Sequence, residues 1–174
     1  LREWIEFNHI VGVEHFYLYN NNSEDDYMNV LKPYIDCGLV TLTQWPYNQK
    51  QMECYMACID EYASETKWLG FIDIDEFIVP KSTNSVYDFL QPFEKKAGSV
   101  NIYWKIFGTS GQLDRKLSGL VSEDFMVCWP KYMDLGKCFY NTAFGFDSNS
   151  KHAAQLHHKF WANYKGKDIP PVNI

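Results

Sequence analysis

Apolar residues in the first eighty positions alternate between helical spacing and strand spacing. Helical segments repeat an apolar residue every three or four positions, and the segments between them are apolar throughout or alternate with a period of two. Alternation with short connections predicts an α/β fold with a mainly parallel central sheet flanked by helices. Ser23 and Asp26 have the spacing of a capping box, which predicts that the second helix begins there. The predicted helices span 3–11, 23–37 and 52–62, and the predicted strands span 13–19, 39–45 and 68–72.

The regular alternation ends at Pro80. A short helix over 86–91 and a strand over 100–107 are the next predicted elements. Residues 108–119 follow, rich in Gly, Ser and Thr and without periodicity. Loops longer than about 12 residues in compact domains are usually lids, binding loops or disordered segments, and we expect a lid. No repeat or linker composition divides the chain, so we expect one domain over residues 1–174.

The composition is that of a soluble globular domain, with 174 residues of which 46% are apolar and 22% charged. A core of this size needs neither disulfides nor a structural metal. The five cysteines include no CxxC pair, so zinc spacing is absent and buried free thiols are expected. A disulfide between Cys128 and Cys138 remains the alternative. No apolar run is long enough to span a membrane, so membrane attachment is expected only through segments outside this chain.

Charge is unevenly distributed along the chain. The net charge is −6, and residues 1–80 hold four Lys or Arg against fourteen Asp or Glu. An acidic chain without a stripe of basic residues argues against nucleic acid as the main partner, because affinity for nucleic acid comes largely from basic contacts to phosphate. A cation bound on the acidic side and an anion bound by late lysines would suit this asymmetry, and solvated faces would suit it equally.

The strongest candidate chemistry lies in Phe71-Ile72-Asp73-Ile74-Asp75-Glu76-Phe77. In an extended chain Asp73 and Asp75 point to the same side, at the end of a buried strand. Ligands bind at the carboxyl ends of the strands in α/β folds, and two adjacent carboxylates favour a hard cation between them. Mg²⁺ or Mn²⁺ would keep coordination sites open for phosphate oxygens. A solvated strand end is the alternative, and Glu76 is either a supporting acceptor or an exposed side chain.

Three segments together resemble the family 92 glycosyltransferases and their family 2 relatives. They are LREWIEFNHIVGVEHFYLYNNNSEDD, WLGFIDIDEFIVP and WKIFGTSG. The resemblance covers residues 1 to about 159 and implies a GT-A fold, which is related to the Rossmann fold and carries a DxD motif. By position it implies that Asp73 and Asp75 bind the metal and the diphosphate of a nucleotide-sugar such as a UDP-sugar, with Mn²⁺ or Mg²⁺ as the cofactor.

The resemblance implies further site residues. Those expected near the base and ribose are Asn20, Asn21 and Asn22, and Lys137 is expected to meet phosphate. His157 or His158 is expected to complete the metal coordination. The residues expected near the donor sugar and the acceptor are Trp104, Phe107, Gly108, Thr109, Ser110 and Gly111. Family members usually begin with a strand ahead of the helix that opens this chain, so we expect a first strand, and part of the nucleoside pocket, to precede Leu1.

The implied reaction moves a sugar, with galactose as a candidate, to a hydroxyl of a glycan acceptor with inversion at the anomeric carbon. Inversion requires a carboxylate base within hydrogen-bond reach of that hydroxyl. Glu123 and Asp124 are the candidates, and Asp114 in the loop is the alternative. In a eukaryote we expect such an enzyme in the Golgi lumen, and in a bacterium in the cytoplasm.

Two other classes of function remain open at this stage. A phosphatase of the haloacid dehalogenase type also carries DxD at a strand end, but on its first strand and with Thr or Val where Phe77 stands here. A catalytically inactive carbohydrate-binding domain would suit the six Trp and twelve Tyr. Hydrolysis of a sugar nucleotide with manganese separates the classes, because the phosphatase releases free phosphate and the binding domain releases nothing.

Overall fold

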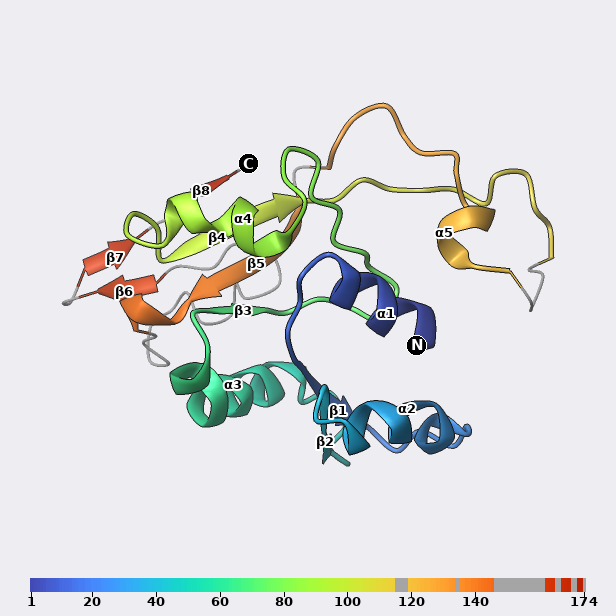
Figure 1. Ribbon diagram of the computed structural model, residues 1–174, viewed down its shortest axis with the longest axis horizontal. Coiled ribbons are helices and arrows are strands. Elements are labelled where there is room, and N and C mark those ends of the chain that lie inside the picture. The colour runs from blue at the N-terminus through green and yellow to red at the C-terminus, as the bar shows by residue number, and fades with distance from the viewer. Residues whose placement is uncertain (115–118, 134, 146–161, 165–166, 170–171, 174) are drawn as a thin grey trace.

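The computed structural model describes residues 1–114, 119–133, 135–145, 162–164, 167–169 and 172–173 (Figure 1). The elements are, in chain order, α1 (Arg2–Ile10), β1 (Phe16–Asn20), α2 (Tyr27–Asp36), β2 (Val40–Gln44), α3 (Gln51–Tyr62), η1 (Ala63–Glu65), β3 (Trp68–Gly70), α4 (Val86–Leu90), η2 (Gln91–Phe93), β4 (Ser99–Tyr103), α5 (Val121–Asp124), β5 (Gly136–Asn141), η3 (Thr142–Phe144), β6 (Ala162–Tyr164), β7 (Lys167–Ile169) and β8 (Val172–Asn173).

The first elements form a β–α–β unit, as the periodicity predicts. β1 and β2 pair in parallel, with Phe16 opposite Val40, and α2 connects them. Their core contains Trp4, Ile5 and Leu31 in addition to these two residues. The predicted capping box is wrong. α2 begins at Tyr27 with Asp26 at the N-cap position and no side-chain cap, whereas Ser23 lies before the helix and its N–H donates to Asn20 Oδ1 at the end of β1.

The main described sheet has the strand order β3-β5-β4-β8 and is not mainly parallel, which corrects the prediction. β5 pairs antiparallel with both β3 and β4, and only β4 and β8 pair in parallel. The connection between β4 and β5 explains why these two strands are antiparallel. It is a long two-stranded excursion that returns the chain in the opposite direction, whereas a parallel pair needs a crossover, usually through a helix.

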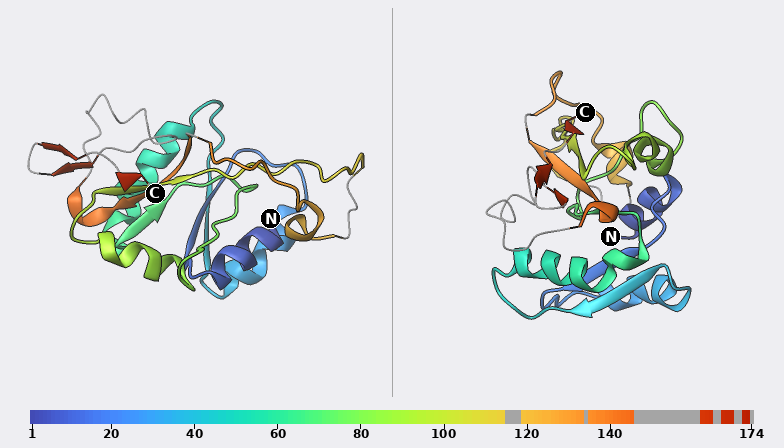
Figure 2. Two further views of the ribbon diagram at one scale, coloured as in Figure 1. Left: turned by 90° about the horizontal axis from the view of Figure 1, so that it is seen from above. Right: turned by 90° about the vertical axis from the view of Figure 1, so that its left-hand side faces the viewer.

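Helices cover both faces of this sheet. Alternate side chains of β5 contact α3 on one face and α4 on the other. Cys138 and Tyr140 contact the cluster under α3, whereas Phe139 between them contacts the cluster under α4. Successive strand residues point to opposite faces, so one buried strand serves two cores. Figure 2 shows β1, β2, α2 and α3 in a lower layer and β4 and β5 above it (right view).

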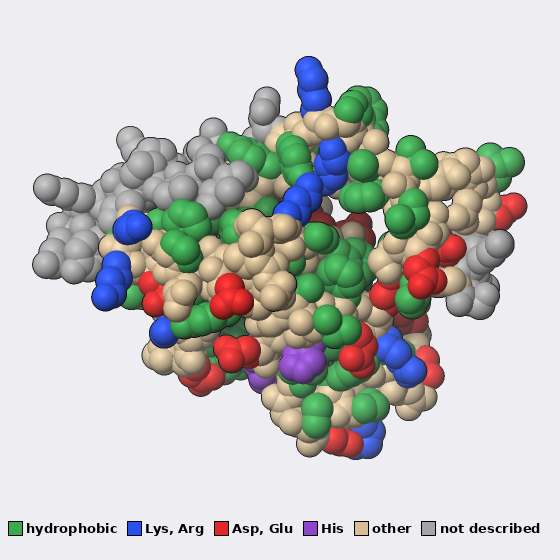
Figure 3. All heavy atoms as spheres, turned by 45° about the horizontal axis from the view of Figure 1, so that its top comes forward, with side chains coloured by type: hydrophobic (Ala, Val, Ile, Leu, Met, Phe, Trp, Pro, Cys, Tyr) green, Lys and Arg blue, Asp and Glu red, His purple; other side chains and the backbone are tan. Residues whose placement is uncertain are grey.

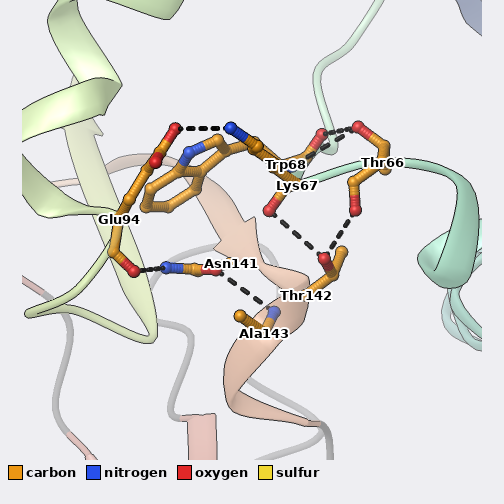
Figure 4. Close-up of polar contacts among 7 residues, drawn as sticks. All are labelled: Thr66, Lys67, Trp68, Glu94, Asn141, Thr142 and Ala143. Atoms are coloured by element: carbon orange, nitrogen blue, oxygen red, sulfur yellow. Dashed lines mark hydrogen bonds and ion pairs between the residues drawn. The ribbon is translucent and has the colours of Figure 1, made fainter.

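Polar contacts join the beginning of β3 to the end of β5 (Figure 4). Thr142 Oγ1 donates to Thr66 O over 2.6 Å, and Asn141 Nδ2 donates to Glu94 O over 2.9 Å. Glu94 also forms an ion pair with Lys67 at 3.4 Å. Asn141 is almost fully buried, so these bonds satisfy an amide that would otherwise be costly to bury. These bonds fix the position of the first residue of β3, and so help to position the segment that follows the strand.

The excursion between β4 and β5, residues 104–114 and 119–133, is called the arm below. Its two sides pair through Gly108 N–H to Val127 O at 2.8 Å and Trp129 N–H to Ile106 O at 2.9 Å. The arm extends from the sheet toward α1 and carries α5 near its far end (Figures 1 and 2). There both oxygens of the Glu3 carboxylate accept hydrogen bonds from residues 121 and 122.

The cysteines are free, so no bridge joins Cys128 and Cys138. Cys54, Cys58 and Cys138 are buried as expected, whereas Cys37 and Cys128 are exposed. None of the helices in the described part of the chain has the length and apolar character needed to cross a membrane.

Candidate active site

The two aspartates of the DxD motif lie in a tight turn after β3. The strand ends at Gly70, earlier than predicted, and the Glu76 N–H donates to Asp73 O over 3.0 Å. Asp73 and Asp75 are therefore not two same-side residues of an extended strand, which corrects the sequence argument. The side chain of Glu76 accepts the Asp73 N–H at 3.2 Å, so this glutamate supports the turn.

Helix α1 holds this turn through two buried polar side chains. The indole Nε1 of Trp4 donates to Glu76 O over 2.8 Å. The amide of Asn8 accepts the Ile78 N–H at 3.2 Å through Oδ1 and donates to Trp4 O at 2.9 Å through Nδ2. Asn8 is fully buried, and a buried polar group persists only with its hydrogen bonds satisfied. α1 thus positions the segment that carries both aspartates.

Lys137 extends from β5 to the same turn. Its Nζ lies 2.8 Å from Asp73 Oδ2, 3.8 Å from Glu76 Oε2 and 5.7 Å from the ring centroid of Trp104. Lys137 is 5% exposed, so its charge needs these partners. Burial raises the pKa of Glu76, and the Asp73 N–H and the Lys137 ammonium partly oppose this rise.

Asp75 is open to solvent at the edge of the turn. It is exposed and forms no hydrogen bond or ion pair within the described residues. Asp73 offers its second oxygen, because Lys137 contacts only Oδ2. Two carboxylates with open positions suit Mg²⁺ or Mn²⁺, which keep waters and phosphate oxygens as other ligands. In the described part of the chain no group of three or more His, Cys, Asp or Glu could hold a metal.

A cavity of about 1470 Å³ lies between β1, α3 and the turn. Its lining includes Asp73 and Asp75, the end of β1 at Asn20 and Asn21, and Tyr55 of α3. Burial, followed by the nearby Asp73 charge, raises the pKa of Tyr55 to about 12, so this phenol stays protonated at neutral pH. The cavity joins an apolar wall along β1 and β3 to acidic groups at one end.

The asparagines after β1 serve the structure as well as the cavity. Asn20 Nδ2 donates to Gln44 Oε1 over 2.7 Å and to the hydroxyl of Tyr27 over 3.0 Å. Asn21 Nδ2 donates to Trp45 O over 2.7 Å. Asn22 has a φ of 55°, a conformation that asparagine tolerates better than most residues. These bonds fix the loop that the resemblance assigns to base and ribose.

The residues predicted for the sugar and for the catalytic base lie on the arm or at its beginning. Ser110 Oγ accepts the N–H groups of Met126 and Val127, which joins the two sides of the arm. Glu123 is exposed on α5, and a Cβ added to Gly119 would lie 2.2 Å from Asp124 Oδ2, so Asp124 packs on that glycine. None of the predicted arm residues lines the cavity. They are Trp104, Phe107, Gly108, Thr109, Ser110, Gly111, Glu123 and Asp124.

The sequence model of glycosyltransferase family 92 matches residues 1–160 of this chain. The chain belongs to this family. A family 92 protein of Oryza sativa subsp. japonica is 32% identical over 116 residues, which is 64% of this chain and 20% of that protein. A family 92 protein of Ricinus communis is 36% identical over 78 residues, 44% of this chain and 14% of that protein. Galactan beta-1,4-galactosyltransferase GALS3 of Arabidopsis thaliana is 31% identical over 108 residues, 55% of this chain and 21% of that protein.

This family 92 chain spans about a fifth or less of the length of these relatives. No solved structure matches it. Membership of the family confirms the resemblance and removes the support for a phosphatase of the haloacid dehalogenase type. His157 and His158 lie outside the described residues, so their predicted part in metal binding stays a prediction.

Sequence reasoning missed three residues of this candidate site. Trp4 and Asn8 fix the turn from α1, and Tyr55 lines the cavity beside Asp73. Trp4 and Tyr55 were visible only as apolar members of helical patterns, so nothing separated them from ordinary core residues. Asn8 had one signal, since a polar residue on the buried side of a short amphipathic helix requires a hydrogen-bond partner.

Proposed function

We propose that this chain is the nucleotide-sugar-binding part of a glycosyltransferase that moves galactose from a UDP-sugar to a hydroxyl of a glycan. One observation carries the proposal: Asp73, Asp75 and the end of β1 line a single cavity in a chain of glycosyltransferase family 92. The choice of galactose rests on two relatives named galactan beta-1,4-galactosyltransferases.

Asp73 and Asp75 are the proposed ligands of Mn²⁺ or Mg²⁺, and either His157 or His158 is proposed to complete the coordination. A bound divalent cation would neutralise charge on the departing nucleoside diphosphate. Lys137 would hold Asp73 in place and add positive charge near the phosphates, since its Nζ already lies 2.8 Å from Asp73. Trp4, Asn8 and Glu76 would keep the turn in one conformation, which lowers the cost of ordering it at each turnover.

The loop with Asn20, Asn21 and Asn22 is the proposed contact for base and ribose. Glu123 is the proposed catalytic base, with Asp124 as the second candidate. Its role would be to accept the proton of the acceptor hydroxyl during attack on the anomeric carbon. Closure of the 108–119 loop over the sugar would exclude water and limit hydrolysis of the donor. Trp104 and residues 107–111 would then face the donor sugar and the acceptor.

A first strand that precedes Leu1 is part of the proposal. All residues of β1 and β3 line the same cavity, while each strand pairs with a described neighbour on one side only. A strand between them would run parallel to β1, because α1 would provide the crossover that a parallel pair needs. It would fill the part of the cavity along β1 and β3, and the end with Asn20, Asp73 and Asp75 is the proposed ligand site. With residues before Leu1 present, the amides of β1 and β3 should exchange with solvent more slowly than in the chain that begins at Leu1. Unchanged exchange would place that strand elsewhere.

The test of the function uses the purified protein with UDP-galactose, a β-1,4-galactan oligosaccharide and Mn²⁺. Asp75→Asn should lower transfer roughly a hundredfold or more, because a group that stabilises transition-state charge is lost. The thermal midpoint should change by no more than a few degrees, because Asp75 is exposed and makes no described contact. Asp60→Asn on α3 removes one exposed carboxylate away from the cavity and should leave transfer unchanged.

The outcomes separate the classes of function. Transfer by the unaltered protein that Asp75→Asn does not affect would show that the DxD motif is structural. Binding of a galactan without binding of UDP in the presence of Mn²⁺ would show a carbohydrate-binding domain. Calorimetry with nucleoside diphosphates, with and without Mn²⁺, measures directly whether the protein binds UDP and whether that binding needs the metal.

A further inference from the structure

The side chain of Asn21 holds the loop that follows β2. Its Nδ2 donates to Trp45 O over 2.7 Å and to Tyr47 O over 3.0 Å. An amide nitrogen has two hydrogens to donate, so both are used inside the protein. β1 and β2 pair in parallel with Asn20 opposite Gln44, so both strands end at the same edge of the sheet. Asn21 therefore fixes the backbone around Tyr47 and keeps no N–H for a ligand.

The ring of Tyr47 is held at this edge with a face left open. Trp45 and Tyr47 form a T-shaped pair, with ring centroids 5.2 Å apart and an interplanar angle of 79°. Such a pair uses at most one face of either ring. Trp45 is itself fixed, because its Nε1 donates to Lys50 O over 3.2 Å and its ring centroid lies 5.8 Å from that of Tyr19. Tyr47 stays 57% exposed, so a flat ligand can stack on its open face.

Tyr47 differs from the exposed rings of the arm because it lines the cavity that contains the DxD motif. Apolar side chains also lie along the arm (upper right of Figure 3), where Trp129 is 68% and Tyr132 49% exposed. Neither of these two rings lines the cavity. Exposure alone therefore does not single out Tyr47, whereas exposure within the cavity of the two aspartates does.

The wall of the cavity continues from this loop to the aspartates through α3. The loop leads directly into the helix, where Gln51 Nε2 donates to the Tyr55 hydroxyl over 2.9 Å. The Tyr55 ring packs on Phe71, with centroids 4.5 Å apart, and Asp73 follows in the same segment. Gln51, Tyr55 and Asp73 all line the cavity. A ligand with a flat group on Tyr47 and a charged group at Asp73 would therefore lie along one wall.

We propose that Tyr47 is the stacking platform for the nucleobase of a nucleoside diphosphate, and that Asn21 is a positioning residue that acts through Tyr47. The inference rests on the proposed function for the diphosphate at Asp73 and Asp75. It deepens that function by naming the side chain that binds the base. Every nucleobase has a flat face, so stacking on an aromatic ring adds affinity for the nucleoside without contact to the phosphates.

The test compares UDP with inorganic pyrophosphate, two ligands that share a diphosphate and differ in the nucleoside. Binding to the purified protein is measured by calorimetry with Mn²⁺. Tyr47→Ala should weaken UDP binding roughly tenfold, because the stack on the base is lost, and should leave pyrophosphate binding unchanged. Tyr47→Phe keeps the ring and should retain the UDP affinity. Asp75→Asn should weaken the binding of both ligands, because both carry the diphosphate.

A mutant cycle tests the part assigned to Asn21. Asn21→Ala should weaken UDP binding and leave pyrophosphate binding unchanged. Because Asn21 acts through Tyr47, the double variant with Tyr47→Ala should bind UDP no more weakly than Tyr47→Ala alone. Additive losses would overturn the positioning role, since they would show that Asn21 contacts the nucleoside itself.

Tyr132→Ala is the matched control, because it removes a tyrosine of similar exposure outside the cavity. It should change neither affinity more than twofold. Equal UDP affinity in Tyr47→Ala and the unaltered protein would overturn the proposal, and so would a loss of β-1,4-galactan binding in place of UDP binding. An unaltered protein that binds no UDP would overturn both the proposal and the proposed function. Binding is measured without transfer, so a protein with the expected affinities that transfers no sugar refutes only the proposed function.

Discussion

Replacing Lys137 by Met should destabilise the protein and at the same time loosen the turn that carries the aspartates. The substitution keeps an unbranched side chain in the buried site of β5 but removes the ammonium group 2.8 Å from Asp73 Oδ2. Asp73 and Glu76 then face each other without the cation between them. Breaking a fully buried pair costs about 3–5 kcal/mol and an exposed pair about 0–1 kcal/mol.

The exposed fractions of the three side chains place the expected loss of stability for Lys137→Met between these limits. The side chain of Lys137 is 6% exposed, whereas that of Asp73 is 43% and that of Glu76 21% exposed, so water takes over part of the interaction. We therefore expect a loss of about 1–3 kcal/mol of unfolding free energy. For a domain of this size each kcal/mol corresponds to roughly 2–4 °C in the thermal midpoint.

A thermal unfolding series at neutral pH provides the assay, with Asp73→Asn and the double variant completing a mutant cycle. The double variant should lose less than the sum of the two single losses, because each single change removes the same ion pair. Mn²⁺ should raise the midpoint of Lys137→Met more than that of the unaltered protein, since a bound cation would replace the missing charge. An additive cycle, or a midpoint for Lys137→Met equal to that of the unaltered protein, would refute the reasoning.

Three further predictions concern the supports of the site. Asn8→Leu should cost about 1–3 kcal/mol in thermal unfolding, because the partly buried Ile78 N–H loses its acceptor, whereas Asn29→Leu on the exposed face of α2 should cost little. Gly136→Ala should cost about 3 kcal/mol or more, since the added Cβ would lie 1.8 Å from Ile102 O between β4 and β5; retained stability would contradict the strand register. In native protein at pH 8, iodoacetamide should modify Cys37 and Cys128 but spare Cys54, because burial raises the pKa of the Cys54 thiol to about 12; mass spectrometry of the modified peptides measures this, and modification of Cys54 at the rate of Cys37 would refute it.

The fold could be predicted from the sequence as far as local periodicity determines it. Helices α1, α2 and α3 and strands β1 and β2 lie within a few residues of the predicted segments, because each presents one apolar face to a nearby partner. Strand direction in the larger sheet could not be predicted in the same way. It depends on whether residues 104–135 cross over the sheet or turn back, and a segment with little periodicity does not reveal that choice.

The site was predictable to a similar extent. The two aspartates after an apolar strand and the loop after β1 were identified, and both line the cavity. The turn geometry and the ion pair with Lys137 were not, because they join residues 64 positions apart through tertiary packing. The family resemblance named Lys137 as a phosphate contact, but nothing in the sequence indicated that it would pair with Asp73 and Glu76.

Helix α1 connects the two halves of the proposed machinery. Through Trp4 and Asn8 it fixes the turn that carries Asp73, and through Glu3 it accepts the N–H groups of Val121 and Ser122 at the beginning of α5. The proposed base Glu123 follows directly on that contact. The distance between the aspartate turn and the base is therefore determined by one rigid helix. A shift of α1 would therefore move the aspartate turn and the proposed base together.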